Sequence, residues 1–344
     1  MFSIGRLTTV IAAQALTFLA GTVLQSVQAQ DVRVQGGADS SAPPRIVLRF
    51  AGDCLFAGYY EESVRDSVSL AFEGFPGLQS ADVAMVNLEN PITTRGVRVP
   101  KPYNFRMDPR FVRALTDGGI DIVSIANNHI FDYGKQGLFD TISYLDSAGV
   151  LHVGAGRDRT EAYRPVILNV RGKRVAFLAY YGGGESPGAG ERSPGVARRD
   201  LSRVTDGIAA VRANADYIVV NFHWGTEKAD RPDRGQIEFA HAVIEAGADA
   251  VIGHHPHVLQ GIERYKNGIV VYSLGNFIFG GNSQSTYNTG IFEVSLGPDE
   301  PRYSFLPVGV REWRATMLSG ADSAAVTDRM RHLSRFFPRS IFNQ

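Results

Sequence analysis

Acidic, amide and imidazole side chains follow five short apolar runs of this 344-residue chain. In chain order, these polar positions are Asp53, Asn87–Glu89, Asn127–His129, His223 and His254–His257. Mixed carboxylate, imidazole and amide donors suit divalent ions such as Mn²⁺, Fe²⁺ or Zn²⁺. Such an ion can lower the pKa of a bound water to about 7 and can polarise a phosphoryl or acyl oxygen. The pattern therefore predicts a metal site capable of hydrolysis.

The elements that must position these residues alternate between strand and helix patterns in the first part of the chain. Strands are expected at 46–51, 83–86, 120–125, 166–170, 175–180, 217–222, 249–252, 269–273, 290–296 and 303–308, and helices at about 61–72, 109–117, 137–147, 201–213, 235–246 and 324–337. Early β/α alternation followed by consecutive strands indicates a layered α/β protein with a mixed sheet or two stacked sheets. Ligands bind beyond the carboxyl ends of such strands, so the five polar segments are expected to converge.

The first 44 residues are expected to lie outside the folded domain. Arg6 precedes the apolar run 7–24. The run is followed by Val27 and Ala29, small residues at the positions that a signal peptidase recognises. We interpret 1–29 as an export signal peptide or, alternatively, as an uncleaved N-terminal anchor, and 30–44 as a polar linker. Both interpretations place the domain outside the cytoplasm, in the periplasm or the extracellular space.

Charge and cysteine content exclude some classes of function. The 35 Lys and Arg residues balance the 35 Asp and Glu residues, so no global field favours nucleic acid or an anionic membrane, although a local basic groove is compatible with this total. Cys54 is the single cysteine, so the chain forms no internal disulfide. The C-terminal helix pattern carries three arginines and either packs on the domain or lies on a membrane surface.

Six motifs in chain order resemble the bacterial capsule-synthesis family CapA, which is associated with poly-γ-glutamate capsule and belongs to the calcineurin-like metallophosphoesterase superfamily. The motifs are Gly52-Asp53, Asn87-Leu88-Glu89-Asn90-Pro91, Ala126-Asn127-Asn128-His129 with Asp132-Tyr133-Gly134, His223-Trp224-Gly225, Gly253-His254-His255-Pro256-His257-Val258 and Ser273-Leu274-Gly275-Asn276-Phe277. The resemblance implies a four-layered α/β/β/α sandwich. It assigns 45–310 to the metallophosphoesterase-like domain and leaves 311–344 as a helical extension of that domain.

The resemblance also implies residue roles. The metal ligands would be Asp53, Glu89, Asn128, His223, His255 and His257. His129 would be the nearby acid or transition-state stabiliser, and we place Asp132 in the catalytic set with it. We further expect Lys101, Arg106 and Asn276 to contact substrate, and Asn127 and His254 to support the ligands from behind.

Two positions depart from the wider superfamily. That superfamily commonly has Asp-x-His on its first strand, whereas this chain has Asp53-Cys54-Leu55, and Glu89 stands where a bridging Asp is usual. The missing imidazole leaves the number of metal ions, one or two, open. Ordinary structural roles are also open, because Asp53 could be a strand-end cap and Asn128 a helix cap.

Two functions of different class fit these observations. The first is a metal-dependent hydrolase that uses a metal-bound water on an anionic cell-surface polymer or its precursor. The second is a non-catalytic factor that holds such a polymer during assembly and export, together with capsule-assembly membrane proteins. Independently of these two functions, the Gly-rich loop at 182–195 either borders the site or is a plain surface loop.

Overall fold

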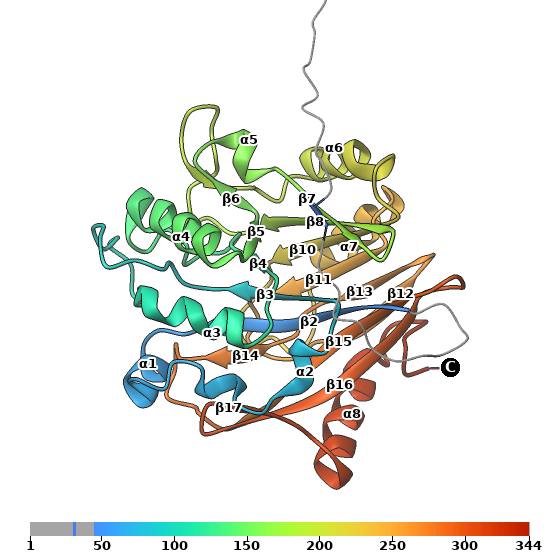
Figure 1. Ribbon diagram of the computed structural model, residues 1–344. Helices are drawn as coiled ribbons and strands as arrows, with labels where there is room; N and C mark the ends of the chain where they lie inside the picture. The colour runs from blue at the N-terminus through green and yellow to red at the C-terminus, as the bar shows by residue number, and fades with distance from the viewer. Residues whose placement is uncertain (1–29, 32–44, 344) are drawn as a thin grey trace, which may run out of the picture.

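Two stacked β-sheets form the centre of the molecule in the computed structural model, which describes residues 30–31 and 45–343 (Figure 1). The seven-stranded sheet has the order β1 (Gln30–Asp31), β7 (Val166–Val170), β8 (Lys173–Tyr181), β10 (Tyr217–His223), β11 (Ala250–His254), β13 (Gly268–Val271) and β12 (Ile262–Tyr265). The eight-stranded sheet has the order β17 (Arg314–Met317), β16 (Arg302–Arg311), β15 (Tyr287–Leu296), β2 (Ile46–Leu55), β3 (Val83–Leu88), β4 (Ile122–Ser124) and β5 (Leu151–Val153), and β14 (Asn276–Phe279) also pairs with β2. A small third sheet joins β6 (Ala155–Gly156) and β9 (Gly195–Val196).

Helices cover the outer faces of both sheets (Figure 1). The seven-stranded sheet is covered by α6 (Leu201–Arg212) and α7 (Arg234–Glu245), and the eight-stranded sheet by α3 (Val112–Asp117) and α4 (Gly134–Ala148). Helix α8 (Gly320–Ser334) contacts β12 of one sheet and β16 of the other. The shorter helices are α1 (Tyr59–Val64), η1 (Leu70–Phe72), α2 (Pro76–Gln79), η2 (Pro109–Phe111) and α5 (Arg159–Ala162). The expected four-layered α/β/β/α fold is confirmed.

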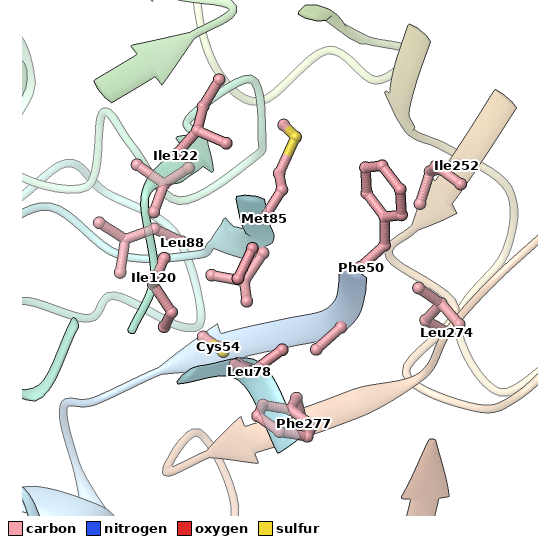
Figure 2. Packing of buried hydrophobic residues seen from close by; sticks show 14 of the residues in the cluster. Phe50, Cys54, Leu78, Met85, Leu88, Ile120, Ile122, Ile252, Leu274 and Phe277 are labelled. Atoms are coloured by element: carbon pink, nitrogen blue, oxygen red, sulfur yellow. The ribbon is translucent and has the colours of Figure 1, made fainter. Parts of the chain in front are cut away.

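Strand periodicity builds this layering. On β8, Val175 and Phe177 face the core between the sheets, whereas Ala176 and Leu178 face the core beneath α6 and α7. Successive side chains of a strand point to opposite faces, so a strand that is apolar at every position must be buried on both. Figure 2 shows Phe50 of β2 beside Ile252 of β11, a contact that ties the two sheets together close to the site.

Most expected elements form, with corrections at their ends. The first strand does not stop at Gly52 but continues to Leu55, because a register irregularity after Phe50 carries it past the site. The single helix expected at about 61–72 is two short pieces, since Arg65 takes a positive φ of 49° that ends α1. Residues 311–344 were expected to be helical, but they begin with β17, which pairs with β16.

The N-terminal segment is described only in part. Gln30 and Asp31, which were assigned to the linker, form β1, a parallel edge strand on β7 that uses the free backbone groups of that edge. The rest of the expected linker and the expected signal or anchor at 1–29 lie outside the described residues. Within the described ranges, no helix combines the length and apolar character needed to cross a bilayer.

Candidate metal centre

The polar ends of strands from both sheets meet at one edge of the molecule. Register pairs Asp53 of β2 with Asn87 of β3 and with Asn276 of β14, and it pairs His223 of β10 with His254 of β11. β2, β3 and β4 run parallel in one sheet and β8, β10 and β11 run parallel in the other, so each sheet presents its carboxyl ends together. The structure thus brings the five polar segments to one place.

Two buried carboxylates form the floor of the site. Asp53 and Glu89 are both fully buried, and the Asn87 amide nitrogen lies 2.9 Å from Asp53 Oδ1 and 3.2 Å from Glu89 Oε2. Glu89 Oε1 accepts no hydrogen bond, although it is buried. A buried carboxylate oxygen without a donor is costly unless a proton or a cation satisfies it.

Histidine rings face these carboxylates from the other sheet. His257 Nδ1 lies 2.8 Å from Asn276 Oδ1 and 3.2 Å from Asp53 Oδ2, so this nitrogen carries the proton. Its Nε2 lone pair is then free, at 3.6 Å from Glu89 Oε1. Asn276 and Asp53 fix the ring tautomer in the way that supporting groups orient histidine ligands in metal sites.

A second imidazole approaches Glu89 from β10. His223 Nε2 lies 2.9 Å from Asn128 Oδ1 and 3.5 Å from Glu89 Oε1. His223 is 1% exposed and Asn128 is 8% exposed, so bulk water does not satisfy these groups. The imidazole nitrogen and the two oxygens are all potential ligands, and they surround a point that a proton or a cation can occupy.

The backbone around Pro256 is held in an uncommon conformation. His255 has a φ of 98° and His257 a φ of 57°, values that side chains with a Cβ rarely adopt. The His255 amide donates to Asp53 Oδ2 at 3.1 Å, and the ring centroids of His255 and His257 are 5.9 Å apart. Such conformations cost about 1–3 kcal/mol each and persist where surrounding structure imposes them, commonly at functional sites.

Electrostatics separates the two carboxyl groups. Burial alone would raise the pKa of Asp53, but hydrogen bonds and charges from His254 and His257 outweigh it and hold the pKa well below its usual value. Burial, reinforced by the charge of Asp53, raises the pKa of Glu89 well above its usual value. Burial lowers the pKa of His223 and of His255, and each neighbouring imidazole adds to the effect. The shifts of His223 and His255 favour the neutral form, which binds metal, and cation binding would favour the ionised form of Glu89.

These residues fit a divalent cation. One group of ligand atoms comprises Glu89, His255 and His257, and another comprises Asp53, Glu89 and His223, with all atoms of each group within 4.8 Å of one another. Glu89 belongs to both groups, and its unsatisfied Oε1 lies 3.5 Å from His223 Nε2 and 3.6 Å from His257 Nε2. The mixed oxygen and nitrogen donors suit a borderline divalent ion.

A hydrogen-bonded pair stands beside this cluster. His129 Nδ1 lies 2.7 Å from Asp132 Oδ2, and the ammonium of Lys101 pairs with the other oxygen of Asp132. Lys101 also donates to Asn128 O at 2.8 Å. Burial lowers the pKa of His129, and the hydrogen bond that its Nδ1 donates to Asp132 opposes that shift. A neutral His129 with its proton on Nδ1 keeps Nε2 free to accept a proton.

The remaining predicted residues divide between the site and its surroundings. Asn127 donates to Asn87 Oδ1 at 3.1 Å and accepts from the amide of His129, and His254 lies 3.4 Å from Asp53. Lys101 and Asn276, which are expected to contact substrate, lie at the site, where Lys101 pairs with Asp132 and Asn276 with His257. Arg106, expected in the same role, is exposed and stacks on Tyr133 at 4.8 Å.

Asn87 lies in an expected motif, but sequence reasoning assigned it no role in the site. Its amide contacts both carboxylates, and its nitrogen lies 3.3 Å from His223 Nδ1. The signal was available, because Asn87 lies two positions before Glu89 and residues two apart on a strand share a face.

Comparison with known proteins agrees with the fold and the motifs. The family model described as "Bacterial capsule synthesis protein PGA_cap" matches residues 47–281. A "Capsule biosynthesis protein CapA" from Bacillus anthracis is 33% identical over 73% of this chain, and a "PGA biosynthesis protein CapA" from Bacillus subtilis is 31% identical over 76%. The matched parts span 64% and 71% of those two proteins.

A solved structure shares the architecture. A Staphylococcus aureus protein described as a candidate 5′-nucleotidase superposes on 84% of this chain and 58% of its own, with a TM-score of 0.50 and 15% identity. At that identity the likeness concerns the fold alone, which is the metallophosphoesterase type. The matching model and the two relatives identify the family: the chain belongs to the bacterial capsule synthesis protein family PGA_cap.

Proposed function

We propose that this chain is a metal-dependent hydrolase of the cell envelope that acts on an anionic polymer of the poly-γ-glutamate type or on its precursor. One observation carries the proposal: the buried Glu89 Oε1, which accepts no hydrogen bond, lies 3.5 Å from His223 Nε2 and 3.6 Å from His257 Nε2, and Glu89 belongs to two groups of potential metal ligands. The names of the relatives support the polymer, and the carboxylate and imidazole cluster supports the chemistry.

The residues have distinct roles in this proposal. Asp53, Glu89, Asn128, His223, His255 and His257 hold one or two divalent ions, of Mn, Fe or Zn. A divalent ion supplies Lewis acidity toward the scissile group and lowers the pKa of a coordinated water. Asn276 and Asn127 orient ligands, and Asn87 donates to both carboxylates and keeps them apart.

His129 moves a proton in this scheme. Asp132 holds the Nδ1 proton, and Lys101 neutralises the charge of Asp132. Nε2 is then the atom that accepts a proton and returns it to the leaving group. The desolvated setting strengthens these charge interactions, because little water screens them.

The test uses the full chain after chelation. Hydrolysis of poly-γ-glutamate or of a model phosphoester should be absent from the chelated protein and should return when Mn²⁺ is added. The double variant His255→Ala/His257→Ala should show no such recovery. If the metal-loaded protein binds polymer and cleaves no substrate, the non-catalytic assembly role replaces this proposal.

Location and partners belong to the same proposal. An envelope polymer requires an exported protein, whether periplasmic, extracellular or anchored by its N-terminal segment, and membrane proteins of capsule assembly are the partners that such a role needs. Nucleic acid is not among the proposed partners, because the chain has no net charge. Fractionation of cells that express the full chain tests the location, and recovery in the cytoplasm contradicts it.

A further inference from the structure

A cavity adjoins the candidate metal centre. It has a volume of about 240 Å³, and His223 and His255 line one side of it. Gly182 and Gly183, the first residues of the Gly-rich loop, line another side, together with Arg199 and Gln236. The cavity therefore opens onto two residues of the metal cluster, and the proposed function gives it no role.

Arg199 is an unpaired cation in this cavity. Its guanidinium lies 5.0 Å from the ring centroid of Phe239 and 5.7 Å from that of Trp224. Within the described part of the chain, no oxygen accepts a hydrogen bond from it and no carboxylate pairs with it. Burial lowers the pKa of Arg199, and the charge of Asp233 opposes this only in part. The neighbouring Arg198 differs, because it donates to the carbonyl oxygens of Gly183 and Ser186.

The acidic groups of the cavity already have donors. Glu185 accepts from the Tyr181 hydroxyl and from the amide of Gly184 at 3.0 Å. Asp233 caps α7 by accepting from the amide of Gln236 at 2.8 Å. Neither carboxylate is hydrogen-bonded to Arg199, so the five donors of its guanidinium remain available.

Gln236 supplies a second free donor. Its side chain is 2% exposed, and its Oε1 accepts from the amide of Asp233 at 3.0 Å. The Nε2 group is buried and has no acceptor. The capping contact at Oε1 fixes the orientation of the amide and leaves the Nε2 end free. The cavity therefore holds a buried N–H donor of Gln236 as well as the unpaired guanidinium of Arg199.

We propose that Arg199 and Gln236 form a subsite for an oxyanion of the substrate, a carboxylate or a phosphate, next to the metal centre. Arginine binds both groups through paired N–H donors, and the two aromatic rings restrict the guanidinium before the ligand arrives. A Cβ at position 182 would lie 3.1 Å from Arg199 Nε, so glycine there leaves the guanidinium more room. That the ligand is a substrate rests on the proposed function, whereas binding of the oxyanion does not require turnover.

Direct binding measurements test the subsite. A γ-linked glutamate pentamer and inorganic phosphate are titrated into the full chain by calorimetry, once with the metal removed by chelation and once after Mn²⁺ is restored. Arg199→Gln should weaken binding by about ten- to a hundredfold, because it removes a charge-assisted interaction. Gln236→Glu keeps the capping acceptor but replaces the donor with a negative charge, so it should weaken binding at least as much.

The controls separate binding from folding and from metal loss. Arg203→Gln removes another arginine that stacks on a ring, Tyr163, but it is exposed and lies outside the cavity, so binding should be unchanged. Metal content and melting temperature should match the wild type in all variants. Arg199→Lys, which keeps the charge and loses the paired donors, should be intermediate.

Each outcome has a meaning. Weakened binding of the pentamer alone assigns the subsite to carboxylates, and weakened binding of phosphate assigns it to phosphate. Affinity of Arg199→Gln within about twofold of the wild type for both probes overturns the subsite, and so does weaker binding that accompanies loss of metal. Because the chelated protein performs no hydrolysis, failure of the proposed activity leaves this result readable.

Discussion

At the scale of single residues, the site is defined by which buried polar atoms have partners. Asp53 has amide and imidazole partners, whereas Glu89 Oε1 has no hydrogen-bond donor. Burial and the charge of Asp53 raise the pKa of Glu89, whereas hydrogen bonds and charges from His254 and His257 hold the pKa of Asp53 low despite its burial. Such a separation of pKa values is typical of sites that bind cations or transfer protons.

His129 provides a test at this scale that leaves the metal cluster intact. His129→Gln removes the imidazole but none of the atoms in the two ligand groups. Turnover should fall by about 10²- to 10⁴-fold, the usual contribution of a positioned acid or base, and metal content should stay unchanged. Steady-state kinetics with metal analysis measure both quantities.

His332→Gln is the matched control, because His332 lies exposed on α8 far along the chain from the site residues. It should retain wild-type turnover. Full activity in His129→Gln would show that this imidazole has no part in proton transfer.

Sequence reasoning predicted that the polar residues at strand ends converge, but not the contacts that depend on packing. Asp53, Glu89 and His223 could be found because parallel strands present their carboxyl ends together. Arg199 could not, since its importance lies in the absence of an acceptor beside Trp224 and Phe239, which no local pattern encodes. Lys101 was named from the sequence, but its pairing with Asp132, 31 positions away in the chain, was not predictable.

At the scale of elements, close backbone approach fixes the strands that carry the ligands. A Cβ on Gly52 would lie 1.9 Å from the carbonyl oxygen of Gly275, and the amide of Asp53 donates to that same oxygen at 2.8 Å. β2 and β14 thus pack so closely beside Asp53 that only glycine fits at position 52.

Gly52→Ala should therefore disturb stability and metal binding together. We expect a loss of about 1–3 kcal/mol in the free energy of unfolding, as for other overpacked cores, and weaker metal retention. Gly184→Ala is the control, because a Cβ there meets nothing within 4 Å. Urea denaturation compares the two, and equal stability of both variants would contradict the close packing at Gly52.

A half-buried acid at the opposite end of the sheet predicts a pH dependence of stability. Asp121, just before β4, accepts from the amide of Ala84 at 2.8 Å, and burial raises its pKa to about 6. The folded state then binds a proton more tightly than the unfolded chain. The stabilisation is complete below the unfolded pKa of about 3.9 and is lost as the pH rises through about 6.

Asp121→Asn should remove this dependence while keeping an oxygen for Ala84. Relative to the variant, the wild type should lose about 1–2 kcal/mol of unfolding free energy between pH 4 and pH 7. This figure is smaller than the full pKa shift implies, because Asp121 is partly exposed and solvent screens its charge. Asp216→Asn should differ from the wild type with the opposite sign and mainly below about pH 4, because hydrogen bonds from Arg174 lower the pKa of Asp216. Denaturation at the two pH values measures the difference, and parallel pH profiles for wild type and Asp121→Asn would rule the effect out.

At the scale of the whole molecule, the layers were predictable and several of their edges were not. Segments such as β8, apolar at nearly every position, indicated strands buried on both faces. β14 was missed because Asn276–Phe279 is short and its pairing partner β2 lies more than two hundred positions earlier. β17 was missed because three of its four residues are exposed, which leaves no apolar alternation to detect.

The whole-molecule arrangement matters because the ligands come from both sheets. Asp53 and Glu89 belong to one sheet, and His223, His255 and His257 come from strand ends of the other or the loop that follows. A cation bound among them would join the two layers, so metal should stabilise the fold as well as serve the chemistry.

The central claim, that these residues form a divalent metal centre, is tested most directly by the metal content of the purified full chain. Elemental analysis compares the wild type, Glu89→Gln and the exposed control Glu238→Gln. Glu89 is common to both ligand groups, so its amide variant should lose most of the divalent metal while remaining folded. Wild type and Glu238→Gln should retain it equally. Equal metal content in all three proteins, or none in the wild type after Mn²⁺ loading and desalting, would contradict the metal centre.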